Sequence, residues 1–111
     1  MDGDVKKAGD VAVVLLLEET LEASNINEFK DKMEPVLEEN TKVVCDMNRV
    51  RFIDSTGCSL FLSFLKRLQK KEGGLKICCP TAPVKNLFTM MGFDRLFGIY
   101  KTREEAIGAF K

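Results

Sequence analysis

The sequence contains no histidine among its 111 residues. Histidine is the commonest general base in enzymes, so a hydrolytic triad in this chain would need an unusual variant. The chain also lacks a glycine-rich phosphate loop of the G-x-x-x-x-G-K-[ST] type. These absences argue against catalysis, and we expect a protein that is not an enzyme and needs no cofactor.

The four cysteines form no C-x-x-C pair. Zinc sites usually draw on paired cysteines or on cysteine together with histidine, so the sequence predicts no metal site. Cys45 and Cys78 lie in apolar runs, where cysteine packs as a small hydrophobic residue. A vicinal disulfide between Cys78 and Cys79 is an alternative that a reducing compartment disfavours.

The sequence has no excess of charge of either sign, because Lys and Arg number 17 and Asp and Glu also number 17. A balanced chain is not built to coat nucleic acid or an anionic membrane, and we expect neither as a partner. The start of the chain lacks the basic and apolar regions of a secretory signal, and the apolar run Val11–Leu17 is too short to cross a bilayer. We therefore expect a cytoplasmic protein.

Hydrophobic residues make up 45% of the chain, enough for the core of one domain spanning residues 1–111. Apolar runs rich in β-branched residues predict buried strands. The expected strands are Val11–Leu17, Lys42–Met47 and Leu75–Cys79, with shorter ones at Val5–Ala8 and Leu96–Tyr100 and a short extended link at Arg49–Ile53.

Helical spacing of apolar residues predicts about four helices. The first begins at Asn25, where Glu28 completes a capping box, and should kink or end near Glu34 because Pro35 removes an amide donor. The others are Thr56–Lys71, Thr81–Met91 and a helix opened by the capping box of Thr102. This order predicts an α/β domain with a mixed, mostly parallel sheet of four to five strands.

The segment Phe52-Ile53-Asp54-Ser55-Thr56-Gly57 places two hydroxyl groups where a helix begins. Amides at a helix start lack intrahelical partners and the macrodipole is positive there, so an anion is accepted readily. Position alone allows two interpretations of Ser55, as a helix N-cap or as a functional hydroxyl. In a third arrangement, Asp54 is the cap and Ser55 is the first helical residue.

The helix after this segment has an apolar face, which should pack on the sheet. Cys58 and Leu62 lie at one margin of that face. They either widen the buried stripe or form an apolar rim beside Ser55 that is open to a partner.

This segment, followed by an apolar helix, resembles the signature of STAS domains, and among them that of bacterial anti-sigma factor antagonists. The preceding strand Val43–Met47 and the later stretch Leu87–Phe97 resemble the family too, so the likeness covers nearly the whole chain. Glu22 and Ser59 occupy positions where the family usually has an aspartate and a second glycine.

The resemblance implies a signalling protein that binds an anti-sigma factor, itself a serine kinase, and so releases a sigma factor. It implies that the kinase phosphorylates Ser55, that the phosphorylated form no longer binds, and that a serine phosphatase restores it. We expect the protein to be a monomer when free. The expected partner-binding residues are Glu22, Asn25, Asp54, Ser55, Thr56, Gly57, Cys58, Ser59 and Leu62.

Two alternatives remain from other classes of protein. The chain could be a STAS scaffold or accessory subunit of a stress-signalling or transport complex, in which Ser55 is never phosphorylated. It could also bind a small ligand such as a nucleotide without turning it over.

Overall fold

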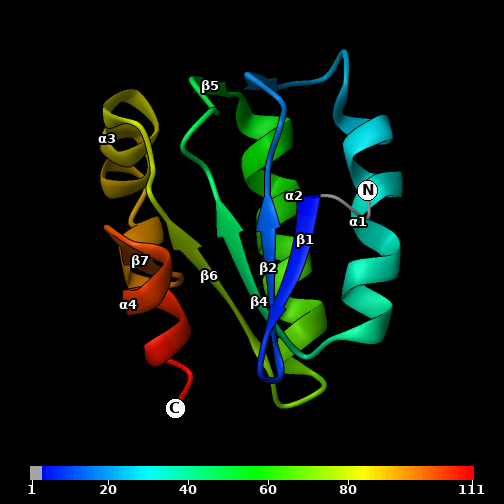
Figure 1. Cartoon of the computed structure of the whole chain (residues 1–111). Helices are drawn as coiled ribbons and strands as arrows, with labels where there is room; N and C mark the ends of the chain where they lie inside the picture. The colour runs from blue at the N-terminus through cyan, green and yellow to red at the C-terminus, as the bar shows by residue number, and fades with distance from the viewer. Residues whose placement is uncertain (1–3) are drawn as a thin grey trace.

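A computed structural model describes residues 4–111 of the chain. Five strands of this part form the main sheet, in the order β1-β2-β4-β6-β7. Figure 1 shows the sheet between two layers of helices. The strands are β1 (Val5–Ala8), β2 (Val11–Leu15), β4 (Lys42–Asp46), β6 (Gly74–Cys78) and β7 (Gly98–Tyr100).

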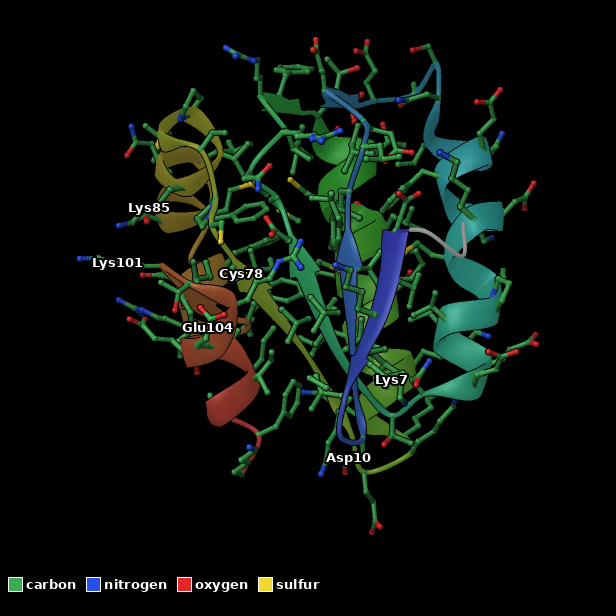
Figure 2. All side chains as sticks on the ribbon, in the orientation of Figure 1. Lys7, Asp10, Cys78, Lys85, Lys101 and Glu104 are labelled. Carbon is green, nitrogen blue, oxygen red and sulfur yellow. The ribbon has the colours of Figure 1, made fainter. Side chains whose placement is uncertain are left out.

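The sheet is mixed, because β1 is antiparallel to β2 whereas the other neighbouring strands are parallel. The predicted α/β fold with a mostly parallel sheet of four to five strands is therefore confirmed. The β1–β2 hairpin turns at Gly9, whose φ of 63° suits glycine. Asp10 lies at the tip of this hairpin (Figure 2). It pairs with Lys42 at 2.8 Å, which ties the hairpin to β4.

Successive residues of the strands point to opposite faces of the sheet, as the pleat requires. On one face, Ala12 and Val14 join the core with α1 (Ile26–Glu39) and α2 (Ser55–Gln69). The helix α3 (Ala82–Met90) adds Val84 and Phe88 to the same core.

The opposite face of the sheet is covered by the short helix α4 (Arg103–Gly108). Val11, Val13 and Val44 pack there against Ala106. Residues of β2 point alternately to the α1–α2 face and to the α4 face, and both faces are buried. This is why the strand is a continuous apolar run in the sequence.

The helix α1 does not end near Glu34, and that part of the prediction is wrong. It continues through Pro35 to Glu39. A proline inside a helix costs about 3 kcal/mol. Burial of Val36 and Leu37 on the core offsets this cost, while Pro35 itself lies on the exposed side.

A second, two-stranded parallel sheet joins β3 (Thr20–Leu21) to β5 (Phe52–Ile53). The backbone amide of Arg51 also donates to the carbonyl of Glu19 at 2.7 Å. The sequence predicted an extended link at Arg49–Ile53 but not its partner strand. This small sheet brings the loop before α1 next to the start of α2.

The predicted residues at the ends of α3 and α4 are confirmed in part. Thr102 caps α4 by accepting from the amide of Glu105 at 3.1 Å, and Gly92 follows α3 with a φ of 75°. Thr81 precedes α3 but does not cap it, since its hydroxyl donates to the carbonyl of Val50 at 2.6 Å.

No helix within residues 4–111 is both long enough and apolar enough to cross a lipid bilayer.

Candidate functional site

The candidate site lies where α2 begins, and Asp54 is its N-cap. One carboxylate oxygen of Asp54 accepts from the amide of Gly57 at 3.0 Å and from the hydroxyl of Thr56 at 2.7 Å. Ser55 is therefore the first helical residue, as one of the sequence interpretations held. The interpretation of Ser55 as the N-cap is wrong.

The side chain of Ser55 is exposed. Its hydroxyl makes no side-chain hydrogen bond to any group within residues 4–111. Because Asp54 already caps the helix, Ser55 has no capping role to fulfil. Its hydroxyl oxygen is free to meet another molecule.

The second carboxylate oxygen of Asp54 accepts a hydrogen bond from the backbone amide of Ala23 at 3.0 Å. The bonds from Gly57 and Thr56 lower the pKa of Asp54, with the Gly57 amide contributing most. The carboxylate next to Ser55 thus stays ionised at neutral pH, because hydrogen bonds favour the charged form.

Asn25 orders the loop before α1, the loop whose Ala23 amide donates to Asp54. Its amide oxygen accepts from the backbone amide of Glu22 at 2.9 Å, and its amide nitrogen donates to the carbonyl of Thr20 at 2.7 Å. Asn25 stands at the start of α1 but makes no side-chain capping bond, so the predicted capping box with Glu28 is wrong. The structure gives Asn25 an organising role within the loop, beside the half-buried Glu22.

Gly57 is buried because β3 and β5 approach α2 closely at this residue. A Cβ atom at Gly57 would lie 2.7 Å from Cγ2 of Ile53 and 2.9 Å from the carbonyl oxygen of Leu21. The glycine of the motif therefore serves packing, and it offers no side chain to a partner.

Cys58 is 3% exposed, and its sulfur lies 3.7 Å from that of Met91. Burial raises the pKa of the Cys58 thiol. Leu62 is half-buried and packs against the main core. Cys58 therefore widens the buried stripe of α2, one of the two interpretations of the sequence, and does not form a rim that is open to a partner.

Thr56 and Ser59 are exposed beside Ser55, as the sequence led us to expect. Together with Lys30 of α1 they line a shallow hollow of about 320 Å³ between the two helices. The polar part of the site therefore extends from Ser55 toward α1.

An apolar surface on the other side of the site was not predicted from the sequence. It comprises Phe52, Leu87 and Met91, and we call it the Phe52 surface. Phe52 is 52% exposed and lines with Leu87 a groove of about 250 Å³. Met91 is 45% exposed and contacts Cys58, one helical turn after Asp54. The available sequence signal was the aromatic residue at the first position of the motif.

Comparison with known proteins agrees with this fold. A sequence model of the STAS domain matches residues 4–106. A protein of Bordetella bronchiseptica, provisionally named anti-sigma factor antagonist BtrV, is 26% identical over 103 residues, which cover 92% of this chain and 89% of that protein.

Two solved proteins share the fold. A provisional anti-sigma factor antagonist from Thermotoga maritima has a TM-score of 0.84 at 23% identity, covering 96% of this chain and 92% of that one. The anti-sigma factor antagonist SpoIIAA, in its unphosphorylated form, has a TM-score of 0.75 at 22% identity, covering 93% and 90%. The phosphorylated form of SpoIIAA, a Bacillus cell fate determinant, has a TM-score of 0.70 at 20% identity, covering 96% and 97%.

Proposed function

The chain belongs to the STAS domain family, and on this premise we propose that it antagonises an anti-sigma factor and is switched off by phosphorylation of Ser55. In this proposal the anti-sigma factor is a serine kinase. Binding of the antagonist releases the sigma factor, and a serine phosphatase later restores the phosphorylated antagonist. The protein then acts in the cytoplasm as a binding protein and catalyses no reaction.

The observation that carries the proposal is the exposed hydroxyl of Ser55 on a helix start that Asp54 already caps. Ser55 can gain a charge without breaking a side-chain hydrogen bond within residues 4–111, and the amides of the helix start favour an added anion. The relatives named anti-sigma factor antagonists, and a structural neighbour solved both with and without phosphate, support the same interpretation.

Electrostatics explains how one phosphate would control docking. Phosphorylation adds about −1.5 to −2 charges, and the helix start tolerates an anion. Asp54 next to it is already ionised, so the surface becomes strongly negative. A partner fitted to a neutral hydroxyl would have to bury that charge, and an unpaired interfacial charge costs about 2–5 kcal/mol.

The surface around Ser55 has the composition of a docking site. Thr56 and Ser59 supply hydroxyl groups on one side, and the Phe52 surface supplies exposed apolar area on the other. Interfaces commonly combine a central apolar anchor with a polar surround. We propose that the anti-sigma factor contacts both parts at once.

The test uses a kinase-type anti-sigma factor encoded near this gene, mixed with the protein and ATP. We expect phosphate on Ser55 and loss of the complex after phosphorylation. Ser55→Ala should stay bound in the presence of ATP, and Ser55→Asp should bind more weakly.

Ser63→Ala is the matched control, because Ser63 is an exposed serine about two turns further along the same helix and is not among the expected partner-binding residues. This variant should be phosphorylated like the unmodified protein. A kinase that binds the protein tightly but leaves Ser55 unmodified would contradict the switch and favour the scaffold alternative.

A further inference from the structure

The carboxyl ends of β4 and β6 bring together three residues that could act as metal ligands. The two strands are parallel neighbours, and Asp46 at the end of β4 is the register partner of Cys78 at the end of β6. Side chains of register partners emerge on the same face of a sheet. The carboxylate of Asp46 and the thiol of Cys78 are therefore adjacent, although 32 positions separate them in the sequence.

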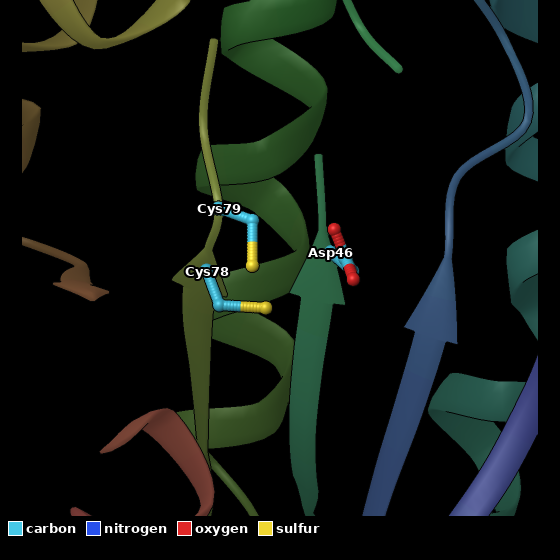
Figure 3. Close-up of side chains that lie close together, drawn as sticks. All are labelled: Asp46, Cys78 and Cys79. Atoms are coloured by element: carbon cyan, nitrogen blue, oxygen red, sulfur yellow. The ribbon is translucent and has the colours of Figure 1, made fainter. Parts of the chain in front are cut away.

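The thiol of Cys79 joins this pair because the backbone turns sharply after β6. In a regular strand, Cys79 would point to the face opposite Cys78. Cys79 instead has a φ of 57°, a conformation that residues other than glycine rarely adopt. Its amide is held by the carbonyl of Tyr100 at 2.9 Å. Figure 3 shows both sulfur atoms on the side of β6 that faces Asp46.

We propose that Asp46, Cys78 and Cys79 form a binding site for a thiophilic divalent metal ion of the Zn²⁺ type. One sulfur atom of each cysteine and one oxygen of the carboxylate lie within 4.8 Å of one another. Zinc takes thiolate sulfur at about 2.3 Å and carboxylate oxygen at about 2.0–2.2 Å, so ligands this close need only small side-chain adjustments to share one ion.

The carboxylate of Asp46 is already oriented by its neighbours. One oxygen accepts from Nε of Arg103 at 2.6 Å, and the other accepts from the amide of Asn48 at 3.0 Å. A carboxylate has about four acceptor positions, so these two bonds leave room for a metal ion. Hydrogen bonds of this kind fix the ligands of known metal centres.

The charges of the occupied site would balance. Asp46 and Arg103 neutralise each other, and the Asp46 side chain is only 3% exposed. A divalent ion would displace the proton from each of the two thiols, which releases two protons to solvent and leaves two thiolates to neutralise the ion. A buried site without net charge avoids most of the cost of placing an ion away from water.

The ion also has a route to the site. Cys79 is half-buried and lines a hollow of about 470 Å³ with Lys85, Tyr100 and Glu105. Figure 2 shows Lys85, Lys101 and Glu104 along the edge of the molecule near Cys78. With three protein ligands, a tetrahedral ion would keep its fourth position for water from this hollow.

This site is separate from the one around Ser55, so its failure and that of the proposed switch are distinguishable. Asp46 and Cys78 lie on the sheet face covered by α4, whereas α2 packs on the opposite face. Metal binding is therefore measured on the isolated protein, with no partner present.

The experiment titrates the metal-free, fully reduced protein with Cd²⁺, in a phosphine reductant that contains no thiol. Thiolate–cadmium bonds absorb in the ultraviolet, and we expect this band to saturate at one ion per chain. Cys79→Ser should weaken binding by at least about 100-fold, since loss of an outer-shell group alone costs about 10–100-fold. Asp46→Asn should weaken Cd²⁺ binding while keeping the thiolate band at high metal concentration.

Cys58→Ser is the matched control, because Cys58 is a buried cysteine on α2, on the other face of the sheet, and its replacement should leave the titration unchanged. Zn²⁺ should also protect Cys79, and not Cys58, from alkylation in the unmodified protein. This protection needs no variant, so the proposal stays testable if Asp46→Asn fails to fold. Absence of a thiolate band at one equivalent of Cd²⁺, or a Cys79→Ser variant that binds Cd²⁺ as tightly as the unmodified protein, would overturn the proposal.

Discussion

The carboxylate of Asp54 accepts a hydrogen bond from the backbone amide of Ala23 at 3.0 Å. These residues lie 31 positions apart, and the bond fastens the loop before α1 to the start of α2. The same carboxylate caps α2, so a single side chain positions both the loop and the proposed phosphorylation site. Any partner that docks on Ser55 will meet this loop as well.

Replacement of Asp54 should therefore loosen two segments at once. We expect Asp54→Ala to lower the melting temperature by about 4–8 °C, the shift that follows from losing one N-cap in a domain of this size. Asp54→Asn should have a smaller effect, because asparagine caps helices nearly as well, although its single oxygen cannot also accept from the amide of Ala23. Thermal unfolding followed by circular dichroism measures both, and equal losses in the two variants would contradict the capping role.

Acid should weaken the fold through the same carboxylate. Hydrogen bonds from Gly57 and Thr56 hold the pKa of Asp54 below its ordinary value of 3.8 in the folded state. The ionised group therefore stabilises the fold at pH values above 3.8, and this contribution disappears as the pH falls through the lower, folded pKa. A side-chain NMR titration should give a midpoint below 3.8 for Asp54. A midpoint above it would show that these bonds are absent in solution.

Gly57 should not tolerate a methyl group. Alanine is normally the better helix former, but its Cβ atom would meet Ile53 at 2.7 Å and the carbonyl oxygen of Leu21 at 2.9 Å. A backbone oxygen yields little, so we expect Gly57→Ala to reduce the free energy of unfolding by about 1–3 kcal/mol. Gly108→Ala is the control, since no atom lies within 4 Å of the added Cβ, and it should stabilise by about 0.5 kcal/mol. Urea denaturation distinguishes the two, and a stable Gly57→Ala variant would show that β3 does not pack this closely.

The Phe52 surface should contribute to partner binding and little to stability. Phe52→Ser removes a side chain that is already 52% exposed, and we expect the Kd for the anti-sigma factor to rise about tenfold or more. Leu96→Ser is the matched control, because Leu96 is 54% exposed but lines a hollow near Leu65 and Gly98. Calorimetric titration of both variants tests the assignment. Equal losses in the two, or none in Phe52→Ser, would place the docking surface elsewhere.

The sequence was sufficient to predict the order of strands and helices and the place of Ser55 near the start of α2. These features depend on local signals, such as the apolar run of β2 and the glycine after α3, which act over a few residues. The STAS family was recognised from the motif itself, because its residues are contiguous. Burial patterns alone would not have placed β3, a strand of two residues.

The choice of helix cap and the end of α1 could not be predicted from local sequence signals, because both depend on residues far away in the chain. Both Asp54 and Ser55 are good caps by residue type, and the contact with Ala23 helps to place Asp54 in that role. The helix α1 continues past Pro35 because tertiary burial of Val36 and Leu37 outweighs a local penalty.

The sequence by itself therefore determined most of the secondary structure, the fold class and the hydroxyl that we propose as a switch. Only the tertiary structure decided that Gly57 and Cys58 are buried, that Phe52 is exposed and that Asp46 stands beside Cys78. The physical reason is that local propensity acts along the chain, whereas strand register and burial are set by the packing of segments far apart in sequence.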